Sequence, residues 1–167
     1  MQRVAIVGLL GSGKTTLAAA LGTATGLQVF QTDRMFLASD GSVTSPDAVR
    51  AKLDQVLTRS AYILEGAQGW TFAPRVAACD TVIWMDIGIL RRALNAFHRR
   101  RRAIRAHQAT GAKRPLPAVR FWGWFCLGHL EECKALKAAL AARPAGVRLV
   151  RLRSFAEVQA FLDNLPK

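Results

Sequence analysis

The first residues of the chain contain a glycine-rich run that could bind a phosphate chain. Gly8-Leu9-Leu10-Gly11-Ser12-Gly13-Lys14-Thr15 is a glycine, four residues and then Gly-Lys-Thr, which is the P-loop pattern. Glycines let backbone N–H groups approach a phosphate closely because they carry no Cβ, and a helix that begins there adds its positive end. The run therefore predicts that the chain binds ATP together with Mg²⁺.

The P-loop pattern also predicts a role for each position. Backbone N–H groups are expected to surround the β-phosphate at Gly8, Gly11, Ser12 and Gly13. Lys14 should reach the β- and γ-phosphates, Thr15 should ligate magnesium, and Thr16 should face the α-phosphate. A chance glycine turn is the alternative, but an apolar run before the loop and helix-favouring residues after it support the phosphate site.

Three carboxylates follow apolar runs, where predicted strands end. Glu65 is expected to hold a magnesium-bound water, with a structural cap of the next loop as the alternative. Asp33 is expected to orient or deprotonate a hydroxyl of the phosphate acceptor, and otherwise to be a surface turn residue. Asp86 is predicted to be the N-cap of the helix that follows it, with a direct catalytic role as the alternative.

Most of the excess positive charge lies in one segment. The segment from Arg91 to Arg120 has no acidic residue and ten basic ones: Arg91, Arg92, Arg99, Arg100, Arg101, Arg102, Arg105, Lys113, Arg114 and Arg120. Without them the net charge falls from +13 to 13 − 10 = +3, so the charge is a local feature, as expected for a lid over polyphosphate.

Helical spacing divides these arginines into two groups. Arg92, Arg99 and Arg102 fall on one face and are predicted to clamp phosphates. A solvated face is the alternative for a run of four arginines, and it is expected for some of Arg100, Arg101 and Arg105. Contact with the backbone of a nucleic acid is a further alternative for the whole segment.

The elements that position these residues alternate along the chain. Apolar or β-branched runs predict strands at Val4–Val7, Leu27–Gln31, Tyr62–Leu64, Thr81–Met85 and Val147–Leu152. Helices are predicted from Lys14, from Ser45-Pro46-Asp47 to about Arg59, over Leu90–His107, within Phe121–Ala142, and after the capping box of Ser154 and Glu157. Such alternation predicts an α/β fold whose parallel strands have right-handed crossovers.

With these elements in place, the chain resembles the adenylate-kinase-like P-loop kinases and, within them, the DNA topology modulation proteins. The resemblance rests on the P-loop, Thr32-Asp33, Tyr62-Ile63-Leu64-Glu65-Gly66, Trp84-Met85-Asp86 and the Arg-rich helix. It implies a three-layer P-loop NTPase fold like that of nucleoside-monophosphate kinases, with five parallel strands in the order 2-3-1-4-5. It also implies an Arg-rich helical lid at about residues 91–120.

The resemblance implies that Asp33 and Arg34 contact the acceptor. The chain departs from adenylate kinases after Gly66, where a Pro-Arg pair should follow closely but Pro74-Arg75 comes later. The acceptor therefore stays open between a nucleotide and a hydroxylated metabolite.

Length and composition limit the remaining possibilities. With 167 residues, of which 51% are hydrophobic, the chain is predicted to form a single domain over residues 1–167. No stretch reaches the roughly 18 to 20 uninterrupted apolar residues of a membrane-spanning helix, and the N-terminal run resembles a strand rather than a signal peptide. Three cysteines favour a reducing compartment, so we expect a cytoplasmic protein that does not act at a membrane, as a monomer or a homodimer.

These patterns favour an ATP-dependent kinase that transfers the γ-phosphoryl group to a small acceptor. One alternative is a nucleic-acid-associated ATPase or switch, whose arginines follow the phosphodiester backbone. A regulatory module that binds nucleotide but turns it over poorly is another. The sequence alone does not separate the three.

Overall fold

The computed structural model describes residues 1–36, 42, 44–110, 117–123, 125 and 129–165. Its centre is a sheet of five parallel strands in the order β2-β3-β1-β4-β5. The strands are β1 (Arg3–Gly8), β2 (Val29–Gln31), β3 (Tyr62–Glu65), β4 (Thr81–Met85) and β5 (Arg148–Leu152). The predicted α/β class and strand order are therefore confirmed.

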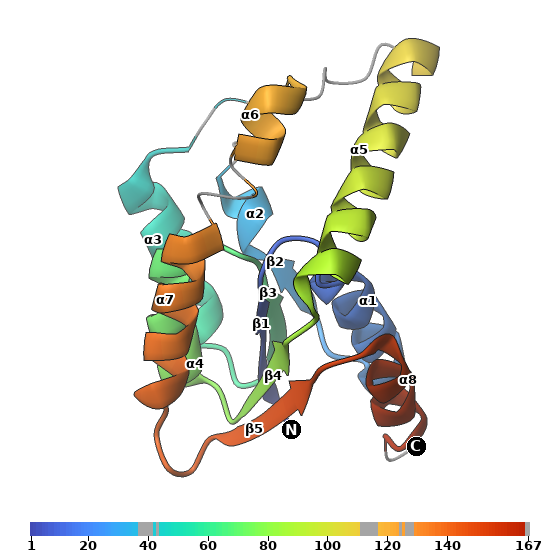
Figure 1. The fold of residues 1–167 in the computed structure, drawn as a ribbon. Coiled ribbons are helices and arrows are strands. Elements are labelled where there is room, and N and C mark those ends of the chain that lie inside the picture. Colours follow the sequence, from blue (N-terminus) through green and yellow to red (C-terminus); the bar gives the residue numbers. More distant parts are fainter. Residues whose placement is uncertain (37–41, 43, 111–116, 124, 126–128, 166–167) are drawn as a thin grey trace.

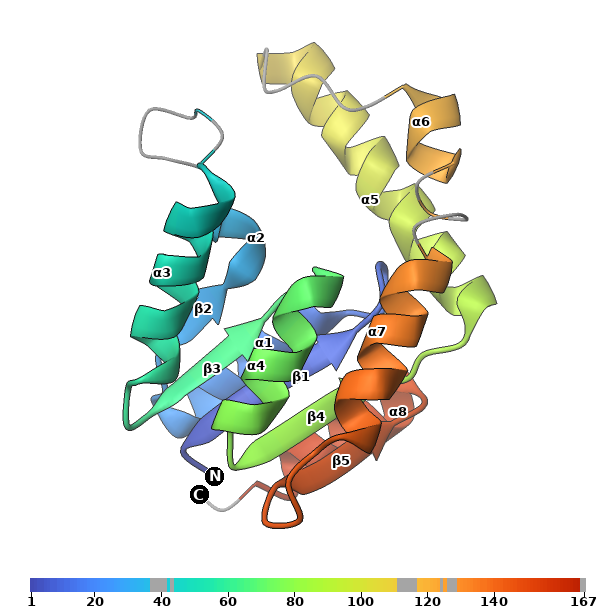
Figure 2. The same cartoon turned by 90° about the vertical axis from the view of Figure 1, so that its left-hand side faces the viewer.

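Helices cover both faces of the sheet, which gives three layers (Figures 1 and 2). One face packs against α1 (Lys14–Thr25) and α8 (Phe155–Asp163). The other packs against α3 (Pro46–Leu57), α4 (Phe72–Ala78) and α7 (His129–Ala141). Alternate residues of β1 supply both cores: Val4 and Ile6 face the first, and Ala5 and Val7 face the second. A strand buried on both faces explains why its sequence is an unbroken apolar run.

Two further helices rise beyond the carboxyl ends of the strands, α5 (Ile89–Thr110) and α6 (Ala118–Gly123) (Figure 1). A short helix, α2 (Thr32–Met35), follows β2 directly, and a 3₁₀ turn, η1 (Gly69–Thr71), precedes α4. Within the described part of the chain, no helix is long and apolar enough to cross a membrane.

Several predicted elements differ from those observed. A single helix was expected within Phe121–Ala142, but α6 ends at Gly123, a poor helix former, and α7 begins at His129. The residues after Glu65 were expected to be loop, yet they form η1 and α4. Pro74 is compatible with α4 because it lies in the first helical turn, where backbone N–H groups have no intrahelical partner.

Asp86 is not the N-cap of the arginine helix, so that prediction is wrong. The helix begins three residues later, at Ile89. The Asp86 carboxylate instead accepts hydrogen bonds from Arg151 of the neighbouring strand, at 2.8 Å from Nε and 2.5 Å from Nη2. The same guanidinium lies 4.3 Å from the ring centroid of Trp84. Asp86 therefore joins β4 to β5.

Arg75, on α4, is a fully buried cation at the centre of the molecule. Its guanidinium donates hydrogen bonds to the carbonyl oxygens of Ile6, Leu64 and Gly66, at 2.7, 2.9 and 3.1 Å. Burial lowers its pKa to about 10, against the opposing effect of Glu65, so the side chain stays charged at neutral pH. Arg75 is thus occupied by the carboxyl ends of β1 and β3 and is not free to bind an acceptor.

Replacing Arg75 by methionine should destabilise the protein strongly, because three buried carbonyl oxygens would lose their donor. We expect a loss of about 3 kcal/mol in the free energy of unfolding, measured by urea denaturation. The matched control is Arg148→Met, at an exposed position on β5, which should change stability by no more than about 0.5 kcal/mol. Equal effects of the two substitutions would contradict this role.

Candidate functional site

The P-loop forms the connection between β1 and α1, at the carboxyl end of the central strand. Its glycines take backbone angles that disfavour other residues, with φ of +79° at Gly11 and +91° at Gly13. Gly11 also lies under the first turn of α5: a Cβ on it would stand 2.3 Å from the carbonyl oxygen of Arg92. The glycines are therefore needed both for the turn and for its close contact with α5.

The polar atoms of the loop suit an anionic ligand. Ser12 is fully buried, and no residue in the described ranges hydrogen-bonds its hydroxyl. Gly13 is the N-cap of α1 and offers no side-chain acceptor, so the first N–H groups of that helix are left for a ligand. A buried orphan hydroxyl beside uncapped N–H groups is what a phosphate group would satisfy.

Lys14 is folded back over the P-loop. Its Nζ donates to the carbonyl oxygen of Leu9 at 3.1 Å, and only 8% of the residue is exposed. Burial lowers its pKa to about 8, while Glu65 and Asp33 act in the opposite direction. The amine thus lies within the loop that is predicted to bind phosphate, at the edge of losing its charge near neutral pH.

The side chains of Thr15 and Glu65 meet although they are fifty positions apart. Thr15 Oγ1 donates to Glu65 Oε1 at 3.0 Å, which joins the first turn of α1 to the end of β3. Glu65 is buried, and burial raises the pKa of its carboxyl group while the Thr15 hydrogen bond lowers it. Two oxygen donors at this distance fit the hard-ligand preference of Mg²⁺. Among the described residues, no group of three or more His, Cys, Asp or Glu side chains could hold a metal.

Asp33 is held by a residue that sequence reasoning missed. Gln68, in the segment after β3, donates from Nε2 to Asp33 Oδ1 at 2.6 Å and accepts from Thr32 Oγ1 at 2.7 Å. Gly66 makes this contact possible, since a Cβ there would be 1.7 Å from Thr32 Oγ1. Gln68 therefore fixes the carboxylate of α2 against the end of β3, while Asp33 itself stays exposed.

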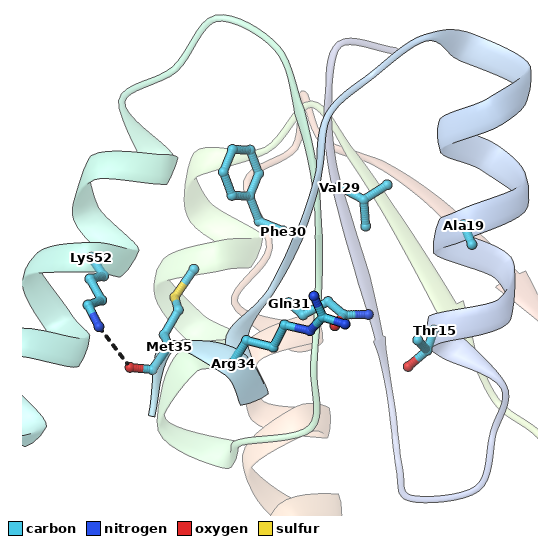
Figure 3. A pocket seen from close by; sticks show the side chains of 8 residues that line it. All are labelled: Thr15, Ala19, Val29, Phe30, Gln31, Arg34, Met35 and Lys52. Atoms are coloured by element: carbon cyan, nitrogen blue, oxygen red, sulfur yellow. Dashed lines mark hydrogen bonds between the residues drawn. The ribbon is translucent and has the colours of Figure 1, made fainter. Parts of the chain in front are cut away.

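A cavity of about 520 Å³ adjoins this region (Figure 3). It lies between α1, β2, α2 and α3, and its lining is Thr15, Ala19, Val29, Phe30, Gln31, Arg34, Met35 and Lys52. Thr15 and Arg34 approach it from opposite sides, and the Lys52 amine donates to the Met35 carbonyl at 3.4 Å. Because Thr15 also contacts Glu65, the cavity borders the candidate magnesium site.

The predicted clamp arginines do not all lie at the P-loop. Arg92 is buried at the base of α5, where its guanidinium lies 5.7 Å from the ring centroid of Phe125. Asn95, one turn on, donates to the carbonyl oxygen of Gly11 at 2.8 Å. Arg99 and Arg102 are exposed further along the helix. The structure thus places Lys14, Thr15, Glu65 and Arg92 around one loop and leaves the other two arginines outside it. Lys113 and Arg114 lie outside the described residues.

Two more side chains near the loop were not predicted to act there. Glu132, in the first turn of α7, is half-buried; burial raises its pKa, and the charges of Lys14 and Arg92 oppose the shift. Phe155 begins α8, and its ring would be 3.2 Å from a Cβ on Gly13. Arg91 lies 5.9 Å from that ring's centroid. No local motif marks either residue, since both come from elements distant in sequence.

Comparison with known proteins supports the fold only. No protein family and no curated protein matches the sequence. Among solved structures, the chain is similar to a shikimate kinase from Acinetobacter baumannii in complex with shikimate, at 17% identity and a TM-score of 0.52, over 100% of this chain and 96% of that one.

Two further structures are similar at the same level. One is an unliganded sugar kinase from Janibacter sp. HTCC2649, at 15% identity and a TM-score of 0.51, over 98% of this chain and 93% of that one. The other is deoxyadenosine kinase from M. mycoides with bound dCTP, at 12% identity and a TM-score of 0.50, over 96% of each chain. The chain therefore has the fold of P-loop kinases.

The lowered pKa of Lys14 predicts a pH dependence of nucleotide binding. The amine loses its charge as the pH rises through about 8, so the affinity for Mg-ATP should fall by about tenfold between pH 7.5 and pH 9. Calorimetry at pH 8.5 should also show proton uptake on binding, because the triphosphate restores the charge. In Lys14→Arg the guanidinium stays charged, so any remaining affinity for Mg-ATP should not change with pH over this range. A flat profile and no proton uptake in the unmodified protein would contradict the assignment.

Proposed function

We propose that the protein is an ATP-dependent phosphotransferase that moves the γ-phosphoryl group to a small acceptor. The observation that carries this proposal is the Thr15–Glu65 contact at 3.0 Å. It lies between a glycine loop suited to phosphate and a cavity of about 520 Å³. Donor phosphate, metal ligands and acceptor space thus adjoin one another, which is the arrangement that an in-line phosphoryl transfer requires.

The donor would bind through the P-loop. Backbone N–H groups from Gly8 to Gly13 would hold the β-phosphate, and the Ser12 hydroxyl and Lys14 amine would turn toward the phosphate oxygens. Thr16 would face the α-phosphate. Thr15 and Glu65 would hold Mg²⁺, which when bound neutralises charge between the β- and γ-phosphates. Burial favours the neutral form of Glu65, so metal binding should also release a proton at acid pH.

Arginines of α5 would neutralise the negative charge on the phosphoryl group during its transfer. The Arg92 backbone contacts Gly11 of the P-loop while its guanidinium lies against Phe125, and Arg99 and Arg102 are one to two turns beyond Asn95. We propose that α5 moves toward bound nucleotide, so that these arginines reach the phosphates. Their freely exposed guanidiniums and the absence of any acidic residue on the helix support this role.

The acceptor would occupy the side of the site formed by α2, α3 and β2. Gln68 holds the Asp33 carboxylate, and that carboxylate would orient or deprotonate an acceptor hydroxyl. Arg34 lines the cavity and would contact the same molecule. Trp70, 44% exposed, has its ring centroid 6.2 Å from that of Phe36, which directly follows the lining residue Met35. A sugar-like metabolite or a nucleotide could stack on such an exposed ring.

The base of the donor nucleotide would rest on Phe155. Its ring covers Gly13 at the start of α1, remains 37% exposed, and has the Arg91 guanidinium beside it. A base attached to phosphates in the P-loop would leave the loop on this side, and aromatic and guanidinium planes both stack on bases.

A second candidate function is a nucleic-acid-associated ATPase or switch, as the resemblance to DNA topology modulation proteins implies. The exposed arginines of α5 favour it. The dependence on salt concentration distinguishes this function from that of a kinase. Affinity for DNA should fall steeply with ionic strength, whereas acceptor-dependent release of ADP should survive moderate salt.

The kinase proposal is tested by a coupled ADP-release screen over nucleoside monophosphates, nucleosides, sugars and small hydroxylated acids. At least one acceptor should raise ADP release well above the rate with water. Glu65→Gln should then lower kcat by about a hundredfold or more and raise the magnesium requirement. Glu131→Gln, an exposed position on α7 paired with Lys134, is the matched control and should behave like the unmodified protein. If no acceptor exceeds water, the function is not a kinase.

Phe155→Ala should weaken ATP binding by roughly tenfold, because base stacking on an aromatic side chain is worth about 1–3 kcal/mol. Binding of inorganic tripolyphosphate, which has no base, should stay unchanged. Phe155→Trp should retain ATP affinity. An equal loss of ATP and tripolyphosphate binding in Phe155→Ala would mean that the ring only supports the P-loop.

A further inference from the structure

The distribution of apolar and charged residues on α5 is the reverse of that on an ordinary surface helix. Its buried residues are Arg92 and Ala96. Its large apolar residues face outward instead: Leu90 is 80% exposed, Leu94 54% and Phe97 43%. In a typical amphipathic helix leucine and phenylalanine face the core and arginine faces water. Packing among the described residues therefore does not explain the outward apolar face of α5.

The three exposed apolar residues form one continuous stripe. Leu90, Leu94 and Phe97 are separated by four and three positions, so they lie one above the other on the helix. The helix rises beyond the sheet, with α6 beside its upper part (Figures 1 and 2). We call these three residues the outer stripe.

Cations flank the outer stripe. Arg91, Arg101 and Arg105 are exposed and lie within about 100° of the stripe on the helical wheel. The Arg101 guanidinium lies 5.7 Å from the ring centroid of Phe97, so its aliphatic stem runs along the apolar surface. A partner for this face must therefore be apolar at its centre and negatively charged around it.

Charge decides among the possible partners. The twenty-two residues of α5 include seven arginines and no acidic residue, so a second copy of the same face would bring like charges together. The backbone of a nucleic acid would pair with the arginines but would leave the leucines in water. The surface of an anionic bilayer offers both negative headgroups and an apolar layer beneath them, and an amphipathic helix can lie in the plane of such a surface.

We propose that the outer face of α5 docks on anionic lipid surfaces, with Leu90, Leu94 and Phe97 inserted and Arg101 and Arg105 at the headgroups. Such a helix lies in the interface and need not span the bilayer, so the proposal is compatible with the described helices and departs from the expectation, drawn from the sequence, that the protein does not act at a membrane. Arg92 and Asn95, which contact the P-loop, lie on the other side of the helix. Docking would therefore leave the phosphate site open, and this inference does not rest on the proposed kinase activity.

The test is co-sedimentation of the full chain with vesicles of pure phosphatidylcholine and of phosphatidylcholine with 30% phosphatidylserine. We expect at least tenfold stronger binding to the anionic vesicles, weakened by salt. Leu94→Gln with Phe97→Gln should reduce that binding about tenfold or more, since the apolar contribution is lost. Arg101→Glu with Arg105→Glu should abolish it.

The matched control for charge is Arg148→Glu with Arg153→Glu, two exposed arginines elsewhere on the surface, which should retain most of the binding. Circular dichroism and Mg-ATP binding of each variant should match the unmodified protein. Equal binding to both kinds of vesicle, or none, overturns the proposal. Unchanged vesicle binding by the glutamine variant also overturns it. If a 20-base-pair DNA duplex binds more tightly than the anionic vesicles, and the glutamine variant binds that duplex as well as the unmodified protein does, the face is a nucleic-acid surface and the proposal is wrong.

Discussion

The site depends on one steric constraint, the tight turn by which the chain passes from β1 into α1. Gly11 and Gly13 have positive φ, and Gly11 lies so close to the backbone of Arg92 that a Cβ would overlap it. No side chain caps the start of α1, so its first N–H groups, at the carboxyl end of the sheet, remain available to bind a ligand. The Thr15–Glu65 contact and the hydrogen bond from Asn95 to Gly11 both follow from where the turn is placed.

The carboxyl end of the sheet brings several acidic side chains together, although the chain as a whole is strongly basic. The net charge is +13, with only eleven acidic residues, yet Asp33, Glu65 and Glu132 all influence the pKa of the Lys14 amine. Burial makes that amine easier to deprotonate, and the carboxylates limit the effect. Arg75 adds a permanent positive charge below them while satisfying strand carbonyl oxygens. The balance keeps a buried cation available where a triphosphate would need it.

Much of the fold could be predicted because local signals are strong there. Short runs of adjacent residues specify all five strands, the P-loop, the N-cap of α3 and the capping box before α8. What could not be predicted depends on distant contacts. Gln68 acts only because β2 and β3 end side by side, Phe155 because the last helix returns to the first, and Asp86 pairs with Arg151 sixty-five positions away. Arg92 was predicted to clamp phosphates, and its burial against Phe125 could not be predicted because Phe125 comes from a distant part of the chain.

The two-sided character of α5 follows from what its inner face has to do. The inner face of α5 meets the P-loop through the Arg92 backbone and through Asn95, whose side chain donates to the Gly11 carbonyl oxygen. A leucine in place of Asn95 would lose that hydrogen bond. The sheet cores, meanwhile, are already filled by α1, α8, α3, α4 and α7. Apolar residues on α5 are therefore not needed for the stability of the described fold. Leu90, Leu94 and Phe97 form one stripe at helical spacing and are not scattered over the surface. Such a stripe is best explained as a surface that contacts a partner outside the chain.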